Sequence, residues 1–223
     1  MLAAAAASPT FAQRVAQQNG GNTGEPPPKL YESLNHAIEA DLKKVRLFFS
    51  YDCPFGLRYH NGLVSWGASI PNSLKFDAFP IITDANDNRL ALAVVGRLIG
   101  QAVAPKSLPA YDYMMYTAIQ GDPETGAGPT KLSMDAVLKA LVNAGASGRD
   151  IKQFVRTKGK GIENNLPSHA KIIKTYNLTA TPSIAIAGRY VINPDNTQGN
   201  PQHMLLMMNG IVSRVVQGDT RAL

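Results

Sequence analysis

The stretch that decides the fold is VRLFFSYDCPFG, which runs from Val45 to Gly56. Its apolar run predicts a buried strand that ends at Ser50, after which the chain reaches Cys53, its only cysteine. Pro54 follows at once, and proline is favoured at the first position of a helix, where its missing N–H would have no partner. The order strand, turn, Cys and Pro therefore predicts that Cys53 stands at a helix N-terminus.

This position makes Cys53 a candidate nucleophile. A sulfur there faces unpaired backbone N–H groups and the positive end of the helix dipole, which favour thiolate over thiol. The alternative is a small hydrophobic residue packed in the core. His60 lies seven residues further along, about two helical turns, which is too far to be the base for Cys53. The histidines lack metal-ligand spacing, and we expect them on the surface or on helix faces: His36, His60, His169 and His203.

The composition is that of a soluble globular protein of one or two domains, with 223 residues, 44% hydrophobic and 17% charged. The net charge of +6 is spread along the chain, without a basic run interleaved with aromatic residues, which argues against nucleic-acid binding. A single cysteine excludes an internal disulfide and a multi-cysteine metal site. No apolar run approaches the ~20 residues that span a bilayer, so no transmembrane segment is expected. Neither a metal nor a cofactor is predicted.

The first 28 residues differ from the rest of the chain. Residues 1–12, MLAAAAASPTFA, are alanine-rich and end in a plausible signal-peptidase site, with cleavage after Ala12. We interpret them as a signal peptide without its basic start; the alternative is an alanine-rich tail. Residues 13–28 are polar and contain a glycine pair and three successive prolines, which predicts a flexible tether.

Strand and helix signals divide the remaining chain. Apolar periodicity predicts a helix over 29–42, before the strand that leads to the cysteine, and a second strand over 74–83. From 85 to 165 the pattern is almost wholly helical. Gly145 is placed to end one of these helices, and Ser147 is placed to cap the next. We therefore expect a helical block in the middle of the sequence.

The last part of the chain returns to strand signals. After a helix that Pro167 opens, the sequence TATPSIAIAGRYVI, residues 179–192, predicts a β-hairpin with a proline at its first strand. Asn200 followed by Pro201 predicts the start of a final helix.

In this order the elements resemble the DsbA-like branch of the thioredoxin superfamily, periplasmic thiol oxidoreductases whose thioredoxin fold is split by a helical domain. The resemblance covers roughly residues 45–216. It is carried by FFS before Cys53-Pro54, by Asn143-Ala144-Gly145, by Thr181-Pro182 and by GRYVINP at 188–194. It implies an α/β thioredoxin fold with an inserted helical domain: a first part over 29–84, the insertion over 85–165 and a second part over 166–223.

The resemblance also implies a site. Pro182 would be a cis proline lying against Cys53; the alternative is a trans proline on an edge strand. The backbone of Thr181 could then pair with an extended peptide as an added strand. Cys53 would be the catalytic residue, and the substrate-binding residues would be Pro54, Phe55, Gly56, Thr181 and Pro182.

The chain departs from the family at residues that control the reactivity of the active-site sulfur. The family motif is Cys-x-x-Cys, whereas Gly56 occupies the place of the second cysteine, so no disulfide can be stored there. Phe55 replaces a histidine that is often found there, and Leu47 stands where a buried acidic residue commonly assists proton transfer. These departures argue that the Cys53 sulfur is less well adapted to form and hold a thiolate than in the family.

Three functions remain open from the sequence. The first, which we favour, is a periplasmic thiol-disulfide interchange protein that uses Cys53 alone on extended or unfolded protein substrates and needs an external thiol or glutathione for release. The second is a redox-inactive scaffold, chaperone, or envelope or secretion-complex subunit that keeps the groove for an envelope partner protein. The third is a glutathione-dependent transferase or isomerase. Whether the chain is an enzyme therefore depends on whether the Cys53 sulfur is redox-active.

Overall fold

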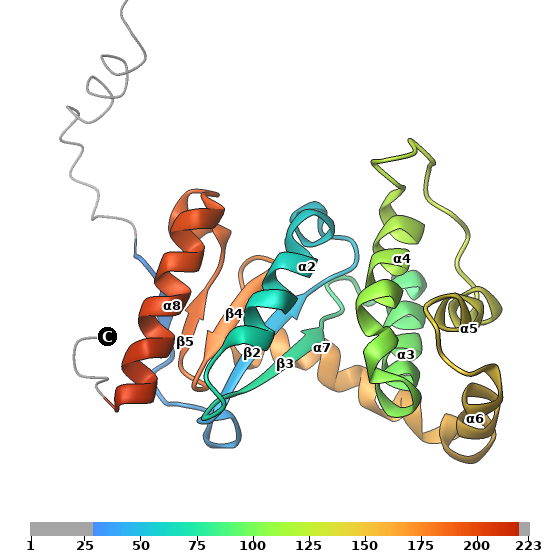
Figure 1. Cartoon of the computed structure of the whole chain (residues 1–223), viewed down its shortest axis with the longest axis horizontal. Helices are drawn as coiled ribbons and strands as arrows, with labels where there is room; N and C mark the ends of the chain where they lie inside the picture. Colours follow the sequence, from blue (N-terminus) through green and yellow to red (C-terminus); the bar gives the residue numbers. More distant parts are fainter. Residues whose placement is uncertain (1–28, 219–223) are drawn as a thin grey trace, which may run out of the picture.

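The structure is a computed structural model that describes residues 29–218. A mixed sheet with helices on both faces forms one part of the molecule, and a block of helices forms the other (Figure 1). The predicted signal peptide over 1–12 and the predicted tether over 13–28 lie outside the described residues. The expected fold class, α/β with a helical insertion, is confirmed.

The sheet has five strands in the order β1-β5-β4-β2-β3. They are β1 (Glu32–Ser33), β2 (Lys44–Phe49), β3 (Lys75–Pro80), β4 (Ser183–Ile186) and β5 (Tyr190–Ile192). Strand β2 is central: it pairs parallel with β3 and antiparallel with β4. A central strand is covered on both faces, which explains why Leu47, Phe48 and Phe49 can all be apolar and fully buried.

Helices cover both faces of this sheet (Figure 1). α2 (Pro54–Ser69) and α8 (Pro201–Gln217) pack on one face, and α7 (Leu166–Thr175) belongs to the other. Successive side chains of a strand point to opposite faces. Leu47 and Phe49 therefore join the larger core beneath α2 and α8, whereas Phe48 packs with Ile172 and Ile173 near α7.

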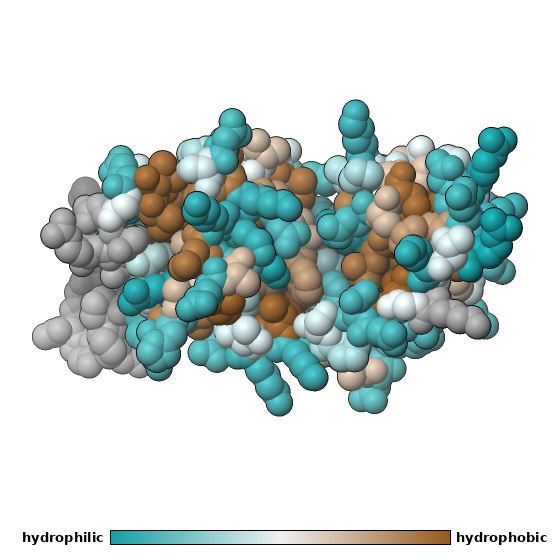
Figure 2. All heavy atoms as spheres, turned by 90° about the horizontal axis from the view of Figure 1, so that it is seen from below, coloured by the Kyte–Doolittle hydropathy of each residue, from teal (hydrophilic) through white to brown (hydrophobic). Residues whose placement is uncertain are grey.

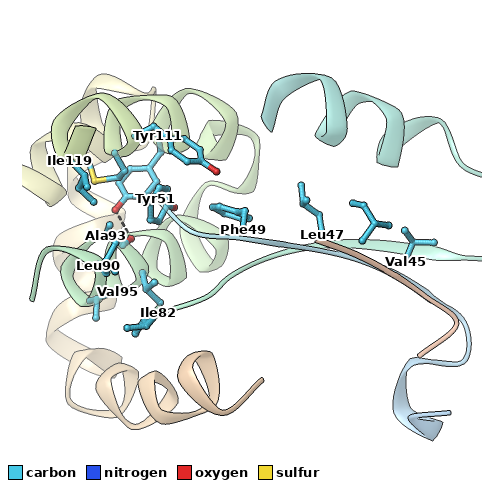
Figure 3. Packing of buried hydrophobic residues seen from close by; sticks show 14 of the residues in the cluster. Val45, Leu47, Phe49, Tyr51, Ile82, Leu90, Ala93, Val95, Tyr111 and Ile119 are labelled. Carbon is cyan, nitrogen blue, oxygen red and sulfur yellow. Dashed lines mark hydrogen bonds between the residues drawn. The ribbon is translucent and has the colours of Figure 1, made fainter. Parts of the chain in front are cut away.

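The helical insertion lies between β3 and α7 in the sequence. Its helices are α3 (Asn88–Val103), α4 (Leu108–Gln120), α5 (Met134–Asn143) and α6 (Gly148–Ile162). Short 3-10 turns complete the chain: η1 (Glu39–Asp41), η2 (Pro105–Ser107), η3 (Glu163–Asn165) and η4 (Pro194–Thr197). The two parts share one core: Figure 3 shows buried side chains continuing from Leu47 and Phe49 on β2 to Tyr51, Tyr111 and Ala93.

The predicted helix over 29–42 is wrong. This segment instead forms β1, an extended stretch and η1, because it pairs with the hairpin between β4 and β5. The backbone N–H of Leu34 donates to the Arg189 carbonyl and that of Ile38 to the Gly188 carbonyl, both at 2.9 Å. Gly188 has a φ of 63°, and a Cβ on it would lie 2.5 Å from the Ile38 carbonyl oxygen, so this close approach requires glycine.

Other local predictions agree with the structure. Gly145 has a positive φ of 101° after α5, and the Ser147 side chain accepts a hydrogen bond from the backbone N–H of Asp150 at the start of α6. Asn200 likewise caps α8 with Pro201 at its start. Within residues 29–218, no helix combines the length and apolar character needed to cross a bilayer. On the face in Figure 2, hydrophobic side chains that reach the surface lie among hydrophilic ones.

Candidate functional site

Cys53 is the N-cap of α2. Its backbone is extended, with φ −82° and ψ 118°, and Pro54 takes the first helical position. The backbone N–H of Gly56 donates to the Cys53 sulfur at 3.4 Å, which satisfies a donor that the first helical turn leaves unpaired. The cysteine is 9% exposed. Local sequence therefore positions the sulfur after β2, largely buried at the point where the helix begins.

The loop before β4 reaches the same sulfur. Cys53 Sγ donates a hydrogen bond to the Thr181 carbonyl oxygen at 3.0 Å, although the two residues are 128 positions apart. The peptide bond between Thr181 and Pro182 is cis. Because β2 and β4 are neighbours in the sheet, the end of one strand and the approach to the other lie together. The structure thus brings Cys53 and Thr181-Pro182 into one site.

The helical insertion also holds the cysteine, through Gln120 at the end of α4. Its side-chain amide donates to the Tyr51 carbonyl at 2.6 Å and to the Cys53 carbonyl at 3.0 Å. Both carbonyls belong to the turn between β2 and α2, where no strand partner is available. A side chain from the insertion therefore fixes the turn that presents the sulfur. Nothing in the sequence pattern around Gln120 predicts this role.

An aromatic ring lies against Gly56, three residues after Cys53. A Cβ added to Gly56 would lie 2.7 Å from the hydroxyl oxygen of Tyr116 and 2.9 Å from one of its ring carbons. Tyr116 is 1% exposed, and its ring packs against Phe49 and Tyr51. A side chain at position 56 would therefore collide with a buried ring from α4.

A chain of buried polar groups extends from Tyr116 into the insertion. The Tyr116 hydroxyl lies 3.3 Å from His60 Nδ1, and His60 Nε2 lies 3.1 Å from a carboxylate oxygen of Asp112. Arg97 Nε donates to both oxygens of Asp112, at 3.1 and 3.2 Å, and the Tyr51 hydroxyl donates to one of them at 2.6 Å. All five side chains are buried, with 5% exposure or less.

Charge pairing keeps the Asp112 carboxylate ionised inside the protein. Burial alone would raise its pKa, but the Arg97 guanidinium and the hydrogen bonds from His60 and Tyr51 hold the pKa of Asp112 below its usual range. Burial and the same carboxylate raise the pKa of Tyr116 well above its usual range, so this phenol is neutral. The cluster is an ion pair between Arg97 and Asp112, with hydrogen bonds from Tyr51 and His60 to the same carboxylate.

Two histidines differ from the expectation of a surface or helix-face position. His60 and His169 are each only 3% exposed. His169 donates from Nδ1 to the Pro80 carbonyl at 2.6 Å and stacks on Phe79, and burial lowers its pKa despite that hydrogen bond. Both are buried because a polar partner from a distant segment satisfies the ring nitrogens. Sequence periodicity carries no information on such partners.

An apolar groove of about 200 Å³ lies between α2, the Pro182 loop, η4 and α8. Phe55, which is 51% exposed, and Pro182 lie at its wall. Its other large apolar lining residues are Tyr59, Leu63, Trp66, Pro194, Pro201, Met204, Leu205 and Met208. Apolar grooves of this kind bind extended peptides or apolar ligands.

The predicted site residues take different places around this groove. Phe55 and Pro182 line it, and Thr181 contacts the sulfur through its carbonyl. Gly56 is buried and faces Tyr116 instead. Leu47 is fully buried in the apolar core. Sequence reasoning missed Tyr116, Asp112 and the groove wall on α8, although an acidic residue among the apolar positions of α4 was a visible signal.

Together the fold and the site define a class of protein: a thioredoxin fold, split by a helical insertion, with a lone cysteine at the start of a helix and a cis proline loop against it. No family model and no curated protein sequence matches the chain. The particular form of the fold is therefore identified by comparison with solved structures.

That comparison identifies a DsbA-like fold. The chain is similar to DsbA of Pseudomonas aeruginosa, with a TM-score of 0.66, 15% identity, and coverage of 88% of this chain and 97% of that one. It is also similar to the oxidoreductase NmDsbA1 of N. meningitidis, with a TM-score of 0.62, 16% identity and coverage of 88% and 97%. DsbA of Proteus mirabilis gives a TM-score of 0.61, 16% identity and coverage of 88% and 100%.

Proposed function

We propose that the protein is a periplasmic thiol-disulfide interchange protein that acts through Cys53 alone on extended protein substrates. The observation that carries the proposal is the position of the sulfur: it caps α2 and contacts the Thr181 carbonyl, and the nearby residues Phe55 and Pro182 line an apolar groove. A nucleophile whose neighbours line such a groove is suited to reaction with a sulfur that a bound segment presents. Export would follow from the signal peptide predicted over residues 1–12.

The proposed reaction needs one sulfur and conserves the number of disulfides. The Cys53 thiolate attacks one sulfur of a substrate disulfide R–S–S–R′, a bond forms between Cys53 and R, and R′ leaves as a thiolate that takes up a proton. An external thiolate, such as glutathione or a second substrate thiol, then attacks the mixed disulfide and releases Cys53. Neither step needs a second cysteine at position 56.

The groove supports an extended polypeptide as the substrate. A cysteine-to-serine variant of Proteus mirabilis DsbA, with a TM-score of 0.62 to this chain, is solved with the non-covalently bound peptide PWATCDS. In the present chain, Phe55, Trp66 and Met208 supply apolar surface along the groove, and Thr181 supplies backbone beside the sulfur. We therefore infer that apolar side chains next to a cysteine are recognised.

The test is direct because Cys53 is the only cysteine. The full chain is incubated with a peptide that carries one mixed disulfide and apolar flanking residues, and intact mass is followed with time. An adduct of one peptide mass on the wild type, its loss with glutathione and its absence from Cys53→Ser support the proposal. A wild type that stays unmodified while a free cysteine peptide exchanges would overturn it.

A second candidate, a redox-inactive scaffold that keeps the groove for an envelope partner, is favoured by one observation. Tyr116 fills the space of a second sulfur, and Cys53 itself is only 9% exposed. In that case Cys53→Ser would bind peptide and support function in cells as well as the wild type does. Loss of function in Cys53→Ser with unchanged peptide binding would instead exclude the scaffold.

A further inference from the structure

We propose that the helical insertion binds a partner protein through an amphipathic helix with acidic residues, in a second groove that we call the insertion groove. This groove has a volume of about 460 Å³; Val95 and Ile99 of α3 form its floor, and its walls include Leu138 of α5 and Val155 of α6. Figure 1 shows α5 and α6 at the end of the molecule away from α8. The inference goes beyond the proposed function, because the insertion groove shares no lining residue with the groove beside Pro182.

The insertion groove exists because α5 and α6 both pack on α3 and diverge from each other. The two helices come together at the turn that joins them, where a Cβ on Gly148 would lie 3.7 Å from Val142. Further along α6, the one described side chain within 4 Å of a Cβ on Gly159 is that of Val155, in the same helix. Space therefore remains between the two helices over the last turns of α6.

Apolar side chains line this space from three helices. Met134 and Leu138 are one turn apart on α5, and Val155 and Ile162 are two turns apart on α6, so each pair lies on one face of its helix. Val155 is 37% exposed. At 1.5 Å per residue, the 10 residues of α5 make a wall about 15 Å long. A groove of this length and lining suits the apolar face of a helix of about three turns.

The rim of the insertion groove on α6 is basic. Lys152 and Arg156 precede the lining residues Val155 and Gly159 by three positions, so they lie beside the lined face of the helix. Both are exposed, and neither has an ion-pair partner within residues 29–218. Residues 131–163 contain seven basic and three acidic residues, a net charge of +4 out of +6 for the chain. Charge complementarity therefore favours a partner with acidic residues.

The remaining charges near the groove indicate where those acidic residues would lie. On α5, the exposed residues Asp135 and Lys139 have opposite charges. Glu163 lines the groove at the end of α6, where it would repel an acidic partner. We therefore place the acidic residues of the partner helix on its flank toward α6, near Lys152 and Arg156 and away from Glu163.

Two other occupants fit the insertion groove less well. A membrane surface binds apolar side chains that protrude from a protein, whereas Val95 and Ile99 are recessed, with 6% and 2% exposure. A second copy of this chain would need an acidic helix to insert. Among the helices within residues 29–218, none has two exposed acidic residues. A separate partner protein is therefore the occupant that the groove favours.

The experiment measures binding to the full chain by fluorescence anisotropy with two labelled, cysteine-free peptides. One has leucines at helical spacing with glutamates on the flank, and the other has lysine in place of each glutamate. Gly159→Phe inserts a ring into the groove. The matched control is Gly161→Phe, because Gly161 is exposed on the same helix and its Cβ would meet nothing within 4 Å. Unfolding in urea checks that both variants fold.

We expect the acidic peptide to bind the wild type, and Gly159→Phe to weaken that binding roughly 10-fold or more, because the ring takes the space of the peptide's apolar face. Gly161→Phe should bind as the wild type does. Equal binding by the two variants, or no binding of the acidic peptide to the wild type, would overturn the proposal. Vesicles of phosphatidylglycerol and phosphatidylcholine are the third ligand, and binding to them but to neither peptide would assign this surface to a membrane instead.

A pair of charge reversals tests the basic rim. Lys152→Glu with Arg156→Glu should weaken the acidic peptide roughly 3- to 30-fold and strengthen the lysine peptide, because exposed ion pairs of modest strength become repulsions. The matched control is Lys171→Glu with Lys174→Glu, two exposed positions on α7 that change the net charge equally. Equal effects of the two pairs would contradict a rim at the groove. Cys53→Ser should bind the acidic peptide as the wild type does but fail in the peptide-disulfide assay, so either proposal can fail without the other.

Discussion

A second cysteine at position 56 should destabilise the protein. In Gly56→Cys the new Cβ would lie 2.7 Å from the Tyr116 hydroxyl and 2.9 Å from a ring carbon, and its sulfur would need further room. Tyr116 is buried between Phe49, Tyr51 and His60, so the ring cannot swing into solvent. The substitution is therefore an overpacking of the core next to Cys53.

The magnitude follows from this clash. Extra atoms in a well-packed core cost about 1–3 kcal/mol. Replacing glycine in a helix returns only a few tenths, roughly 0.3 kcal/mol for cysteine. We expect a net loss of about 1–3 kcal/mol in the free energy of unfolding, which for a chain of this size is a fall of roughly 2–12 °C in Tm.

Urea unfolding under reducing conditions measures this loss without a disulfide. The matched control is Gly62→Cys, which places a cysteine in the same helix at a position where a Cβ meets nothing within 4 Å. In a double-mutant cycle with Tyr116→Ala, the cost of Gly56→Cys should shrink by roughly 0.5–3 kcal/mol. Equal stability of Gly56→Cys and Gly62→Cys would refute the packing argument.

Three further predictions concern the insertion and the groove. Asp112→Asn leaves the Arg97 charge buried without its partner and should cost about 3–5 kcal/mol at neutral pH in urea unfolding. Because the pKa of Asp112 is lowered in the fold, its stabilisation is complete above about pH 4 and is lost as the pH falls through the lowered value; the variant should therefore show a flatter acid limb. Gln120→Ala removes two hydrogen bonds to the cysteine turn and should lower the free energy of unfolding by roughly 1–3 kcal/mol, and an unchanged urea midpoint would contradict this. Leu205→Glu, in the groove, should weaken binding of an apolar peptide in a fluorescence titration, whereas Leu206→Glu, 68% exposed and outside the groove, should not.

Local chemistry made much of the fold predictable. Pro54 after Cys53, Ser147 before α6 and Asn200 before α8 are caps whose effect depends on neighbouring residues only, and each marks a helix start in the structure. The apolar run of β2 identified the central strand for a similar reason, because a strand that is buried on both faces has consecutive apolar residues. Local signals of this kind can be interpreted from the sequence without any knowledge of tertiary contacts.

The other features of the fold and the site depend on contacts between residues that are distant in the sequence. Segment 29–42 has helical periodicity, but Glu32 and Ser33 pair with β5 as the edge strand β1, which overrides it. The polar cluster likewise joins Asp112 to Tyr51 and His60, which precede it by 61 and 52 residues. A histidine or aspartate within an apolar pattern shows that a partner is needed, and only the fold shows which one.

The close approach of Gly56 and Tyr116 makes a second sulfur difficult to introduce at position 56. A lone substitution at position 56 overpacks the core, and trimming the ring first opens a cavity beneath α2. Two segments separated by 60 positions in the sequence would have to change together. Packing alone therefore disfavours a second sulfur beside Cys53, independent of any demand from a substrate.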